Sequence, residues 1–378
     1  MAHTEGGSHL PKKENTVEPE AAVKKKKDIP IIVPIALAVL AVILALVLFV
    51  NGKLNLLDYD DGKLKTEFSG DVNESEDLEL NLSGLEQKDA PTMSELDTID
   101  EEGIINILLL GTDERDFSFS EDARADAIML LSLNTNDYSA KLISIERGTG
   151  VPILDGEYEG LYDWITHCFR YGGADLMMRE VEECFKVKVD RYVRINLNML
   201  VKVIDVIGGV DVELTALEAW YINTVSRYED VAPYLNQGYY RAEDSDFEPT
   251  NLVEGMNHLH GEAALAYARL RALDSDWHRI ERQRTVLQAC VDTIGSADLS
   301  TLNELCNEIL PMVRTNLTKG EIAALMLKAP GFLNVDFGQM TLPAQGTYGA
   351  MTGMGERGMF APDFDVNAKI LQEFIYGK

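Results

Sequence analysis

Basic side chains are scarce in this 378-residue sequence, and several common catalytic motifs are missing altogether. There are 34 lysines and arginines against 63 aspartates and glutamates, which gives a formal net charge of −29. Such a chain repels anionic polymers, so a general nucleic-acid-binding protein is excluded. The sequence contains no Walker motif, no Gly-x-Ser-x-Gly elbow and no His-Glu-x-x-His helix. These absences argue against P-loop, serine-hydrolase and zincin chemistry.

Cysteine is also sparse. Four residues occur, in two pairs with a spacing of 16: Cys168 with Cys184, and Cys290 with Cys306. No Cys-x-x-Cys pair exists, which argues against a zinc site. In an exported domain these pairs predict either two local disulfides or four buried thiols, and the spacing alone leaves both open.

A glycine motif near the C-terminus has the wrong context for nucleotide binding. Gly353, Gly355 and Gly358 form G-x-G-x-x-G, but no strand is expected directly before them and Pro362 follows soon after. A dinucleotide site needs a strand before the glycines and a helix after them. We therefore expect a flexible loop.

Long uncharged runs are rare, and one stands apart. Ile29 to Val50 contains no charged or polar side chain, and this length suffices for a helix that crosses a bilayer. Lys24 to Lys27 precede the run, which favours a cytoplasmic N-terminus and an extracellular location for everything after Asn51. A cleaved signal peptide is the alternative, but the run is longer than a signal core and no small-x-small site follows it. A single-pass membrane anchor is therefore expected.

Composition divides the remaining chain into segments. The first 28 residues are polar and low in complexity, which predicts a disordered cytoplasmic tail. The tract after the apolar run is rich in Asp, Glu, Ser and Asn, as in an acidic extracytoplasmic linker or accessory segment. The expected organisation is a tail over 1–28, an anchor over 29–50, the acidic segment over 51–100, a catalytic domain over 101–334 and a C-terminal extension packing on it over 335–378. That extension is expected to be loop-rich, with a last helix from Val366 to Tyr376.

Alternating strands and helices predict an α/β domain. Ile104–Leu110, Ala127–Leu133 and Lys141–Ile145 are apolar enough to be buried strands. Helical segments follow from Trp164 onward, with a break at Gly172-Gly173. We expect a central mixed sheet between helices, as a three-layer α-β-α arrangement.

Charged residues lie at the ends of these strands. Asp113 and Arg115 follow the first strand, Arg124 and Asp126 precede the second, and Arg147 follows the third. Strand ends are where α/β sheets place their sites. Asp113 and Asp126 are candidate ligands for Mg²⁺, which prefers hard oxygen donors. The alternative is that the acids and arginines of these two segments pair with one another, and both can hold.

An arginine cluster lies further along this acidic chain. Between Ala266 and Arg284 there are five arginines: Arg269, Arg271, Arg279, Arg282 and Arg284. From Trp277 onward a helix is expected, and it would place Arg279, Arg282 and Gln283 on one face. Guanidinium groups that converge suit phosphate or pyrophosphate. The competing interpretation is a solvated helix with surface ion pairs.

Together these segments resemble one family. They occur in the family's order from about Ile104 to Leu327: NILLLGTDER, RADAIMLLSLN, LISIERGT, YGG, VIGGVDV, LHGEAALAYARLR and DWHRIERQR. The chain resembles the LytR-CpsA-Psr family of cell-wall phosphotransferases. The membrane-anchor arrangement also agrees with that family.

The resemblance implies an outward-facing, Mg²⁺-dependent phosphotransferase. It would transfer a polyprenyl-pyrophosphate-linked anionic glycopolymer, of teichoic acid or capsular type, to a peptidoglycan sugar hydroxyl and release polyprenyl phosphate. A pyrophosphatase side activity, with water as the acceptor, is a variant of this reaction. The alternative is a non-catalytic scaffold or regulator of cell-envelope assembly that binds polyprenyl phosphate.

The resemblance also assigns roles to residues. The implied catalytic residues are Arg115, Asp126, Arg147, Arg269, Asp276 and Arg279. The implied pyrophosphate ligands are Arg115, Arg124, Arg147, Arg269, Arg271, Arg279, Arg282 and Gln283, and the implied metal ligands are Asp113 and Asp126.

Three departures from the family pattern bear on activity. Glu146-Arg147-Gly148 replaces Pro-Arg-Asp, so the arginine is kept while the acid moves to its other side. Trp164-Ile165-Thr166 replaces Lys-Ile-Asn, and Asp276-Trp277-His278-Arg279 replaces Asp-Phe-Gly-Arg. These changes are compatible with a different acceptor, a different polymer or reduced activity.

Overall fold

The computed structural model describes residues 52–64, 80–114, 119–120, 123–225, 251–270, 273, 276–332 and 338–378. They belong to one unit, Phe49–Lys378. The predicted tail and membrane anchor lie outside the described residues. No helix within the described ranges combines the length and apolar character that a bilayer span requires.

A seven-stranded mixed sheet organises the domain, in the order β1-β10-β7-β2-β3-β4-β11. β2 is parallel to β7 and antiparallel to β3, whereas β4 is antiparallel to β3 and parallel to β11. The mixed sheet predicted from the sequence is therefore confirmed. The strands are β1 (Asp58–Tyr59), β2 (Ile104–Thr112), β3 (Ala125–Asn134), β4 (Ala140–Ile145), β7 (Arg191–Asn196), β10 (Arg314–Thr315) and β11 (Gly338–Leu342).

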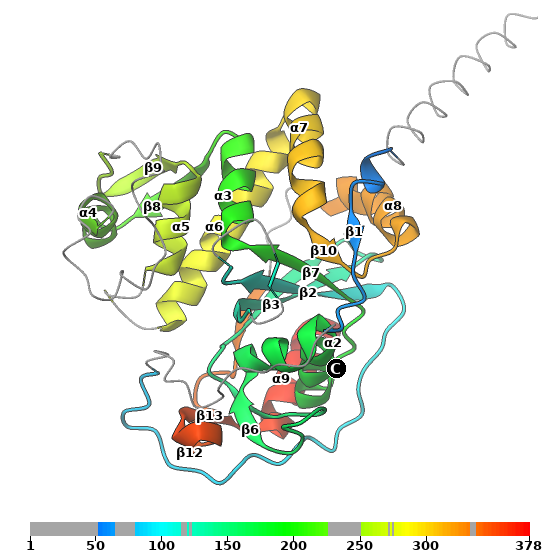
Figure 1. Ribbon diagram of the computed structural model, residues 1–378, viewed down its shortest axis with the longest axis vertical. Helices are drawn as coiled ribbons and strands as arrows, with labels where there is room; N and C mark the ends of the chain where they lie inside the picture. The colour runs from blue at the N-terminus through cyan, green and yellow to red at the C-terminus, as the bar shows by residue number, and fades with distance from the viewer. Residues whose placement is uncertain are drawn as a thin grey trace, which may run out of the picture. The chain divides into compact units, whose positions relative to one another are not determined.

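Helices lie on both faces of this sheet (Figure 1). On one face are α2 (Ile165–Phe185) and α9 (Phe364–Tyr376), and on the other are α3 (Leu197–Val206), α5 (Gly261–Arg269), α6 (Asp276–Ser296) and α7 (Leu299–Ile309). Because strand side chains alternate between faces, Leu108, Leu130 and Ile143 join the core under α2 and α9.

A second core lies among the helices of the other face. The hairpin of β8 (Val210–Leu214) and β9 (Gly255–Leu259) packs with α3, α4 (Ala216–Val225), α5 and α6. Its apolar side chains form a cluster separate from the core under α2. The helices that carry the arginine cluster thus have hydrophobic support of their own.

Glycine breaks α2 at the predicted place. Gly173 has φ 69° and ψ −162°, so the two predicted helices form one kinked element. A Cβ at this position would lie 2.3 Å from the Gly62 carbonyl oxygen. Only glycine accommodates both the backbone angles and this close approach.

The C-terminal extension differs from the prediction. It adds β11 to the central sheet and forms an antiparallel hairpin of β12 (Tyr348–Thr352) and β13 (Gly358–Pro362). The last helix, predicted from Val366 to Tyr376, is confirmed as α9. The prediction of a loop-rich segment was wrong because β11 pairs with β4, some 200 residues earlier, and local patterns do not report such pairing. The glycine motif forms the turn of this hairpin and includes the 3-10 helix η3 (Met354–Glu356), so a strand does precede it.

Part of the predicted linker is built into the domain. β1 is an edge strand of the sheet, and Gln87 forms a bridge with Ala350 of β12. Lys88 N donates to the Ala350 carbonyl at 2.8 Å. Residues 80–100 therefore act as an accessory segment. The four cysteines are free thiols, so the disulfide alternative is wrong.

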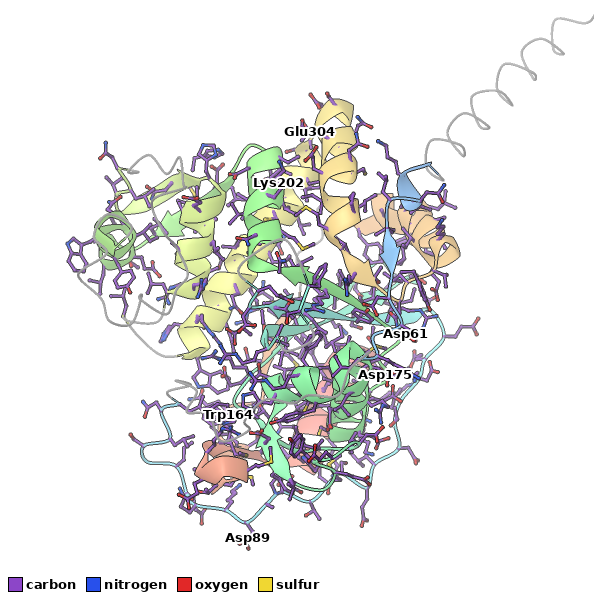
Figure 2. All side chains as sticks on the ribbon, in the orientation of Figure 1. Asp61, Asp89, Trp164, Asp175, Lys202 and Glu304 are labelled. Atoms are coloured by element: carbon purple, nitrogen blue, oxygen red, sulfur yellow. The ribbon has the colours of Figure 1, made fainter. Side chains whose placement is uncertain are left out.

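The remaining elements connect these layers. They are the hairpin β5 (Gly150–Pro152) and β6 (Tyr162–Trp164), the helix α8 (Lys319–Lys328), and the 3-10 helices η1 (Leu310–Met312) and η2 (Ala329–Phe332). Trp164, labelled in Figure 2, packs with Met351 and Met359 of the C-terminal hairpin. This contact joins the start of α2 to the extension.

Candidate active site

Strand direction brings the predicted polar residues to one edge of the sheet. β2, β4, β7 and β11 end at this edge, and the antiparallel β3 begins there. Asp113 follows β2, Asp126 is the second residue of β3, and Arg147 follows β4. The three residues therefore lie along the same edge of the sheet.

Asp126 and Arg147 form an ion pair at this edge. Arg147 Nη1 donates to Asp126 Oδ1 at 2.9 Å, and the side chains are 5% and 16% exposed for arginine and aspartate. Ile128 pairs with Ile145, so continuing the register by two residues places Asp126 opposite Arg147. The pair therefore extends the β3–β4 ladder beyond its last hydrogen-bonded residues.

A β-bulge presents Asp126. Gly111 pairs with Ala127 and Thr112 pairs with Ala125, which leaves Asp126 as the extra residue opposite β2. Bulges redirect side chains and are common beside active sites. The bulge leaves Asp126 without a pairing partner in β2. On its other side Asp126 still meets Arg147, which follows β4.

Asp113 pairs with Arg124 in the same manner. The Arg124 backbone N–H donates to Asp113 Oδ1 at 2.9 Å, and Arg124 Nε donates to Oδ2 at 3.0 Å. The alternative that the two segments pair with each other is thus correct for Asp113 and Arg124. Asp126 instead takes its arginine from the loop after β4.

Aromatic contacts connect the arginine-bearing helix α6 to that loop. The Trp277 ring lies 5.7 Å from Tyr348 and 6.0 Å from Phe360, centroid to centroid. Phe360 N donates to the Gly148 carbonyl at 3.0 Å. The first turn of α6 is therefore joined to the residue after Arg147, and Arg279 is buried two residues beyond Trp277.

Other arginines of α6 have partners elsewhere. Arg282 Nε donates to Glu218 Oε1 of α4 at 2.7 Å, and Nη1 donates to the Leu270 carbonyl at 2.9 Å. Arg284 Nη1 donates to the carbonyl of Met340 in β11 at 3.1 Å. Arg282, predicted to bind pyrophosphate, thus links α6 to α4. The helix face predicted to hold Arg279, Arg282 and Gln283 for the substrate therefore also carries a contact between helices.

Some predicted residues cannot be placed. Arg115 and Arg271 lie outside the described residues, and so does the side chain of Asp276, whose backbone begins α6. Arg269 is the last residue of α5, at the end that leads toward α6.

Two residues at which the sequence departs from the family pattern, Glu146 and Thr166, form hydrogen bonds next to the Asp126–Arg147 pair. Glu146 is fully buried, and its Oε1 accepts from the Gly148 backbone N–H at 3.5 Å. The Thr166 hydroxyl donates to the Ala125 carbonyl at 2.7 Å, and Thr166 N donates to the Arg147 carbonyl at 3.3 Å. Thr166 therefore anchors the start of α2 to both strand segments that carry the Asp126–Arg147 pair.

A buried carboxylate organises the same region and was not predicted. Asp163 is fully buried and accepts hydrogen bonds from Tyr171 Oη at 2.7 Å and from Arg357 Nη1 at 3.2 Å, and it lies 2.9 Å from His167 Nδ1. Burial alone would raise the pKa of Asp163, but the hydrogen bonds from His167 and Tyr171 and the nearby Arg357 charge outweigh it and lower the pKa. Arg357 belongs to the glycine-rich turn, which explains why that turn packs here.

Arg194 is a second residue that sequence reasoning missed. Its guanidinium lies 4.6 Å from the Phe119 ring centroid and 4.5 Å from that of Phe169, and it also pairs with Glu114. Burial lowers the pKa of Arg194. These contacts hold the loop after β2, which carries Asp113, against β7 and α2. The signal was the pair of arginines on the short strand RYVRIN.

The donor set suits a divalent cation only if the substrate completes it. Asp113 and Asp126 are partly exposed carboxylates that flank neighbouring strand ends, and each already accepts from an arginine. Within the part of the chain that the structure describes, no group of three or more His, Cys, Asp or Glu could hold a metal. Mg²⁺ commonly uses one or two carboxylates together with substrate phosphates, so the residues fit that mode.

Comparison with known proteins agrees with this geometry. The LytR_cpsA_psr family profile matches residues 71–361, which is most of the chain. The chain belongs to the LytR_cpsA_psr family. The resemblance noted in the sequence is therefore confirmed, and it extends to the C-terminal hairpin.

Curated relatives of this LytR_cpsA_psr protein match more than half of its length. The chain is 31% identical over 221 residues to the polyisoprenyl-teichoic acid–peptidoglycan teichoic acid transferase TagU of Bacillus mycoides strain KBAB4, and 30% identical to TagU of Bacillus anthracis. The first match covers 58% of this chain and 62% of the relative. The similarity thus spans about three fifths of the length of these relatives.

Solved structures of the family have a similar fold. TagT bound to LIIa-WTA has a TM-score of 0.53 and 26% identity, with 72% of this chain and 91% of that chain covered. TagV of B. subtilis has the same TM-score at 25% identity, covering 73% and 98%. TagT with bound octaprenyl pyrophosphate lipid has a TM-score of 0.51 at 25% identity, covering 75% and 93%.

Proposed function

We propose that this protein transfers a polyprenyl-pyrophosphate-linked anionic glycopolymer to a peptidoglycan sugar hydroxyl and releases polyprenyl phosphate. The observation that carries the proposal is the set of arginines and carboxylates at one sheet edge, above all the Asp126–Arg147 pair. Membership of the family supports it. Relatives named as teichoic acid transferases, and TagT with a bound pyrophosphate lipid, support it as well.

The reaction requires positioning and charge neutralisation more than covalent help from the protein. The acceptor oxygen attacks the phosphorus that carries the glycan, and the bond from that phosphorus to the oxygen of the leaving polyprenyl phosphate breaks. Arg147 and Arg279 are assigned to the pyrophosphate, where guanidinium groups stabilise the growing charge on the leaving phosphate. The hydroxyl proton would pass to one of two carboxylates: Asp276, or Asp126 if that side chain does not bind the metal.

A divalent cation is part of the proposal. Asp113 and Asp126 would hold Mg²⁺ together with oxygens of the substrate. When bound, the ion would offset negative charge on the pyrophosphate. A pyrophosphatase side reaction follows if water takes the place of the sugar hydroxyl.

Apolar residues on the face of the sheet opposite α2 offer a surface for the polyprenyl chain. Ile107, Met129 and Leu142 are buried on this face, yet they join neither the core under α2 nor the core among α3 to α6. Leu265 and Ile280 of the covering helices are also buried outside both clusters. We assign these side chains to the layer between sheet and helices, which would have to open to admit a polyprenyl chain.

The membrane anchor is proposed from the sequence. Ile29 to Val50 would cross the membrane once, with the N-terminus in the cytoplasm and the domain outside. Such a location would place the domain beside the bilayer that carries its lipid-linked donor.

A transfer assay tests the function. The full chain in detergent is incubated with a polyprenyl-pyrophosphate glycan and a peptidoglycan fragment, with Arg279→Ala and Asp126→Ala in parallel. We expect wild-type protein to release polyprenyl phosphate and join sugar to the fragment, and both variants to lose this activity. Tight lipid binding without product, over several polymer types, would instead identify a scaffold that binds polyprenyl phosphate.

A further inference from the structure

Helix α8 is apolar but has no buried residue. Its sequence is KGEIAALMLK, in which six of ten residues, Ile322 to Leu327, are apolar. None of the ten is buried, and Leu327 and Met326 are 85% and 48% exposed. A surface helix ordinarily buries its apolar stripe against the core. Exposed apolar patches of this kind mark interaction sites.

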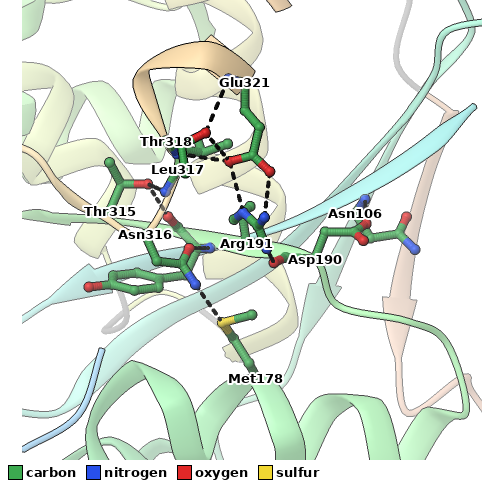
Figure 3. A network of polar contacts seen from close by, with 10 residues as sticks. Asn106, Met178, Asp190, Arg191, Thr315, Asn316, Leu317, Thr318 and Glu321 are labelled. Atoms are coloured by element: carbon green, nitrogen blue, oxygen red, sulfur yellow. Dashed lines mark hydrogen bonds and ion pairs between the residues drawn. The ribbon is translucent and has the colours of Figure 1, made fainter. Parts of the chain in front are cut away.

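The helix is nevertheless held firmly in the domain. Arg191 Nε donates to Glu321 Oε2 at 3.1 Å, and the Arg191 Nη2 group binds the other carboxylate oxygen (Figure 3). The Thr318 backbone N–H donates to Glu321 Oε2 at 2.8 Å, and its hydroxyl accepts from Glu321 N. This capping box and ion pair fix the orientation of α8. They also neutralise the only acid of the helix.

The remaining charges of α8 are positive. Lys319 and Lys328 stand at its two ends. A helix with an apolar surface and terminal lysines suits the interface of an anionic bilayer, where the apolar groups enter and the ammonium groups meet phosphates.

The segment before β1 lies beside this helix. Lys319 Nζ binds Asn55 Oδ1, and Lys53 Nζ binds Asn307 Oδ1 of α7. Leu56 and Tyr59 of the same segment are 38% and 62% exposed. Tyrosine and lysine are typical of the region where a bilayer meets water.

Chain connectivity identifies the partner. The apolar run ends at Val50, two residues before Gly52, where the described residues begin. Two residues span at most about 7 Å. If the run crosses a bilayer, the segment of Lys53 to Tyr59 starts at the bilayer surface.

We propose that α8 and residues 53–59 form a membrane-contact surface that rests on the headgroup region of an anionic phospholipid bilayer. The inference rests on the proposed anchor and deepens the proposed function. A domain held against the bilayer keeps its site at a constant height above the layer in which the pyrophosphate of a lipid-linked donor lies.

Spin-label accessibility tests this surface without turnover. The full chain is prepared with Cys306→Ser, which removes the one cysteine that is not buried. Nitroxides are attached at Leu327→Cys and Tyr59→Cys, and Met256→Cys of β9, 68% exposed and apolar, is the matched control. Each protein is placed in nanodiscs of phosphatidylcholine and phosphatidylglycerol, and relaxation by oxygen and by a water-soluble nickel chelate is measured.

We expect the labels at 327 and 59 to lose most of the nickel effect while they keep or gain the oxygen effect, and the label at 256 to remain open to nickel. Lys319→Glu with Lys328→Glu should restore nickel access at 327. Equal nickel access at 327 and 256 would overturn the proposal.

Shielding from both reagents would also overturn it, because a second copy of the chain or residues 65–79 would then cover α8. A chain that does not enter the nanodiscs would refute both the anchor and this surface. Transfer activity in detergent would be unaffected by that outcome, so failure of this inference is distinguishable from failure of the proposed reaction.

Discussion

Asp126 lies directly opposite Arg147 in the continued register of β3 and β4, and their side chains meet at 2.9 Å. The pair stands at the edge where β2, β4 and β7 end and where helices α2 and α6 begin. The carboxylate holds the guanidinium in one orientation through a charge-assisted hydrogen bond.

Disrupting this pair should impair the reaction. We expect Asp126→Asn and Arg147→Lys each to lower kcat for polyprenyl phosphate release by about 10²–10³-fold, because the charge-stabilising group loses its orientation or its fork. The thermal midpoint should fall as well, because the Arg147 side chain is only 5% exposed and Asp126→Asn leaves its charge without a carboxylate, so kcat is compared at a temperature where every variant is folded.

Asp155→Asn is the matched control for that experiment. Asp155 pairs with Arg179 at 3.1 Å on the surface, where the side chains are 65% and 43% exposed. Exposed pairs contribute at most about 1 kcal/mol. Full turnover by Asp126→Asn would contradict the assignment of the site.

Arg282 should behave as a structural residue. Glu218 is almost buried and receives the Arg282 Nε donor at 2.7 Å. Arg282→Met should therefore lower the free energy of unfolding by about 3–5 kcal/mol, because it leaves a carboxylate buried without its cation. Denaturant titration measures this loss.

The double variant Arg282→Met with Glu218→Gln provides the control. Removing the stranded charge should recover much of the lost stability. If Arg282→Met unfolds like the wild type but binds the lipid pyrophosphate weakly, then Arg282 acts on the substrate, as the sequence had predicted.

Glu180 predicts an unusual dependence of stability on pH. Its side chain is buried on α2, Oε1 accepts from Leu154 N at 2.8 Å, and burial raises its pKa from 4.5 to about 8. Between these values the folded state keeps a proton that the unfolded state has released. The contribution of Glu180 to the free energy of unfolding is therefore greatest below pH 4.5 and falls as the pH rises toward 8.

Glu180→Gln should remove that dependence and raise the free energy of unfolding by about 3–5 kcal/mol near pH 8. Unfolding curves from pH 5 to 9 measure the difference. Glu321→Gln is the contrasting control, since a hydrogen bond from Arg191 lowers the pKa of Glu321 to about 2, and its effect is lost only in acid. Parallel pH profiles for wild type and Glu180→Gln would show that Glu180 is ionised in the fold.

Metal removal should stop transfer. We expect EDTA to abolish polyprenyl phosphate release and added Mg²⁺ to restore it, because the proposed cation offsets pyrophosphate charge. Asp113→Asn should raise the Mg²⁺ concentration for half-maximal rate at least about tenfold. Undiminished transfer in EDTA would assign the charge neutralisation to the arginines alone.

Local pattern predicted the strands of the site well. β2, β3 and β4 are buried on both faces, so each is an apolar run that a sequence shows directly. Asp113, Arg124 and Asp126 could be singled out from the sequence because they are the charged residues next to the ends of these apolar runs. β11 was missed because its pairing with β4 is decided by a distant partner.

The sequence patterns did not predict which carboxylate pairs with which arginine. A single-residue bulge takes Asp126 out of register with β2, and Asp126 pairs with Arg147 instead. The spacing of residues in the sequence does not predict such a bulge. Arg282 shares a helix face with Arg279, yet Glu218 lies 64 residues away and meets it only when α4 packs near α6. Asp163, buried beside Arg357, was overlooked because a lone aspartate carries no motif.

Two levels of information thus define this protein. Periodicity predicted an α/β domain, the apolar run at 29–50 predicted an anchor, and the ordered motifs carried the resemblance to the LytR_cpsA_psr family. These properties could be predicted because they depend on residues close together in the chain. Only the tertiary structure decides which arginines can serve the substrate and which support the fold. The physical reason is that a guanidinium takes its role from the carboxylates brought against it, and those come from distant segments.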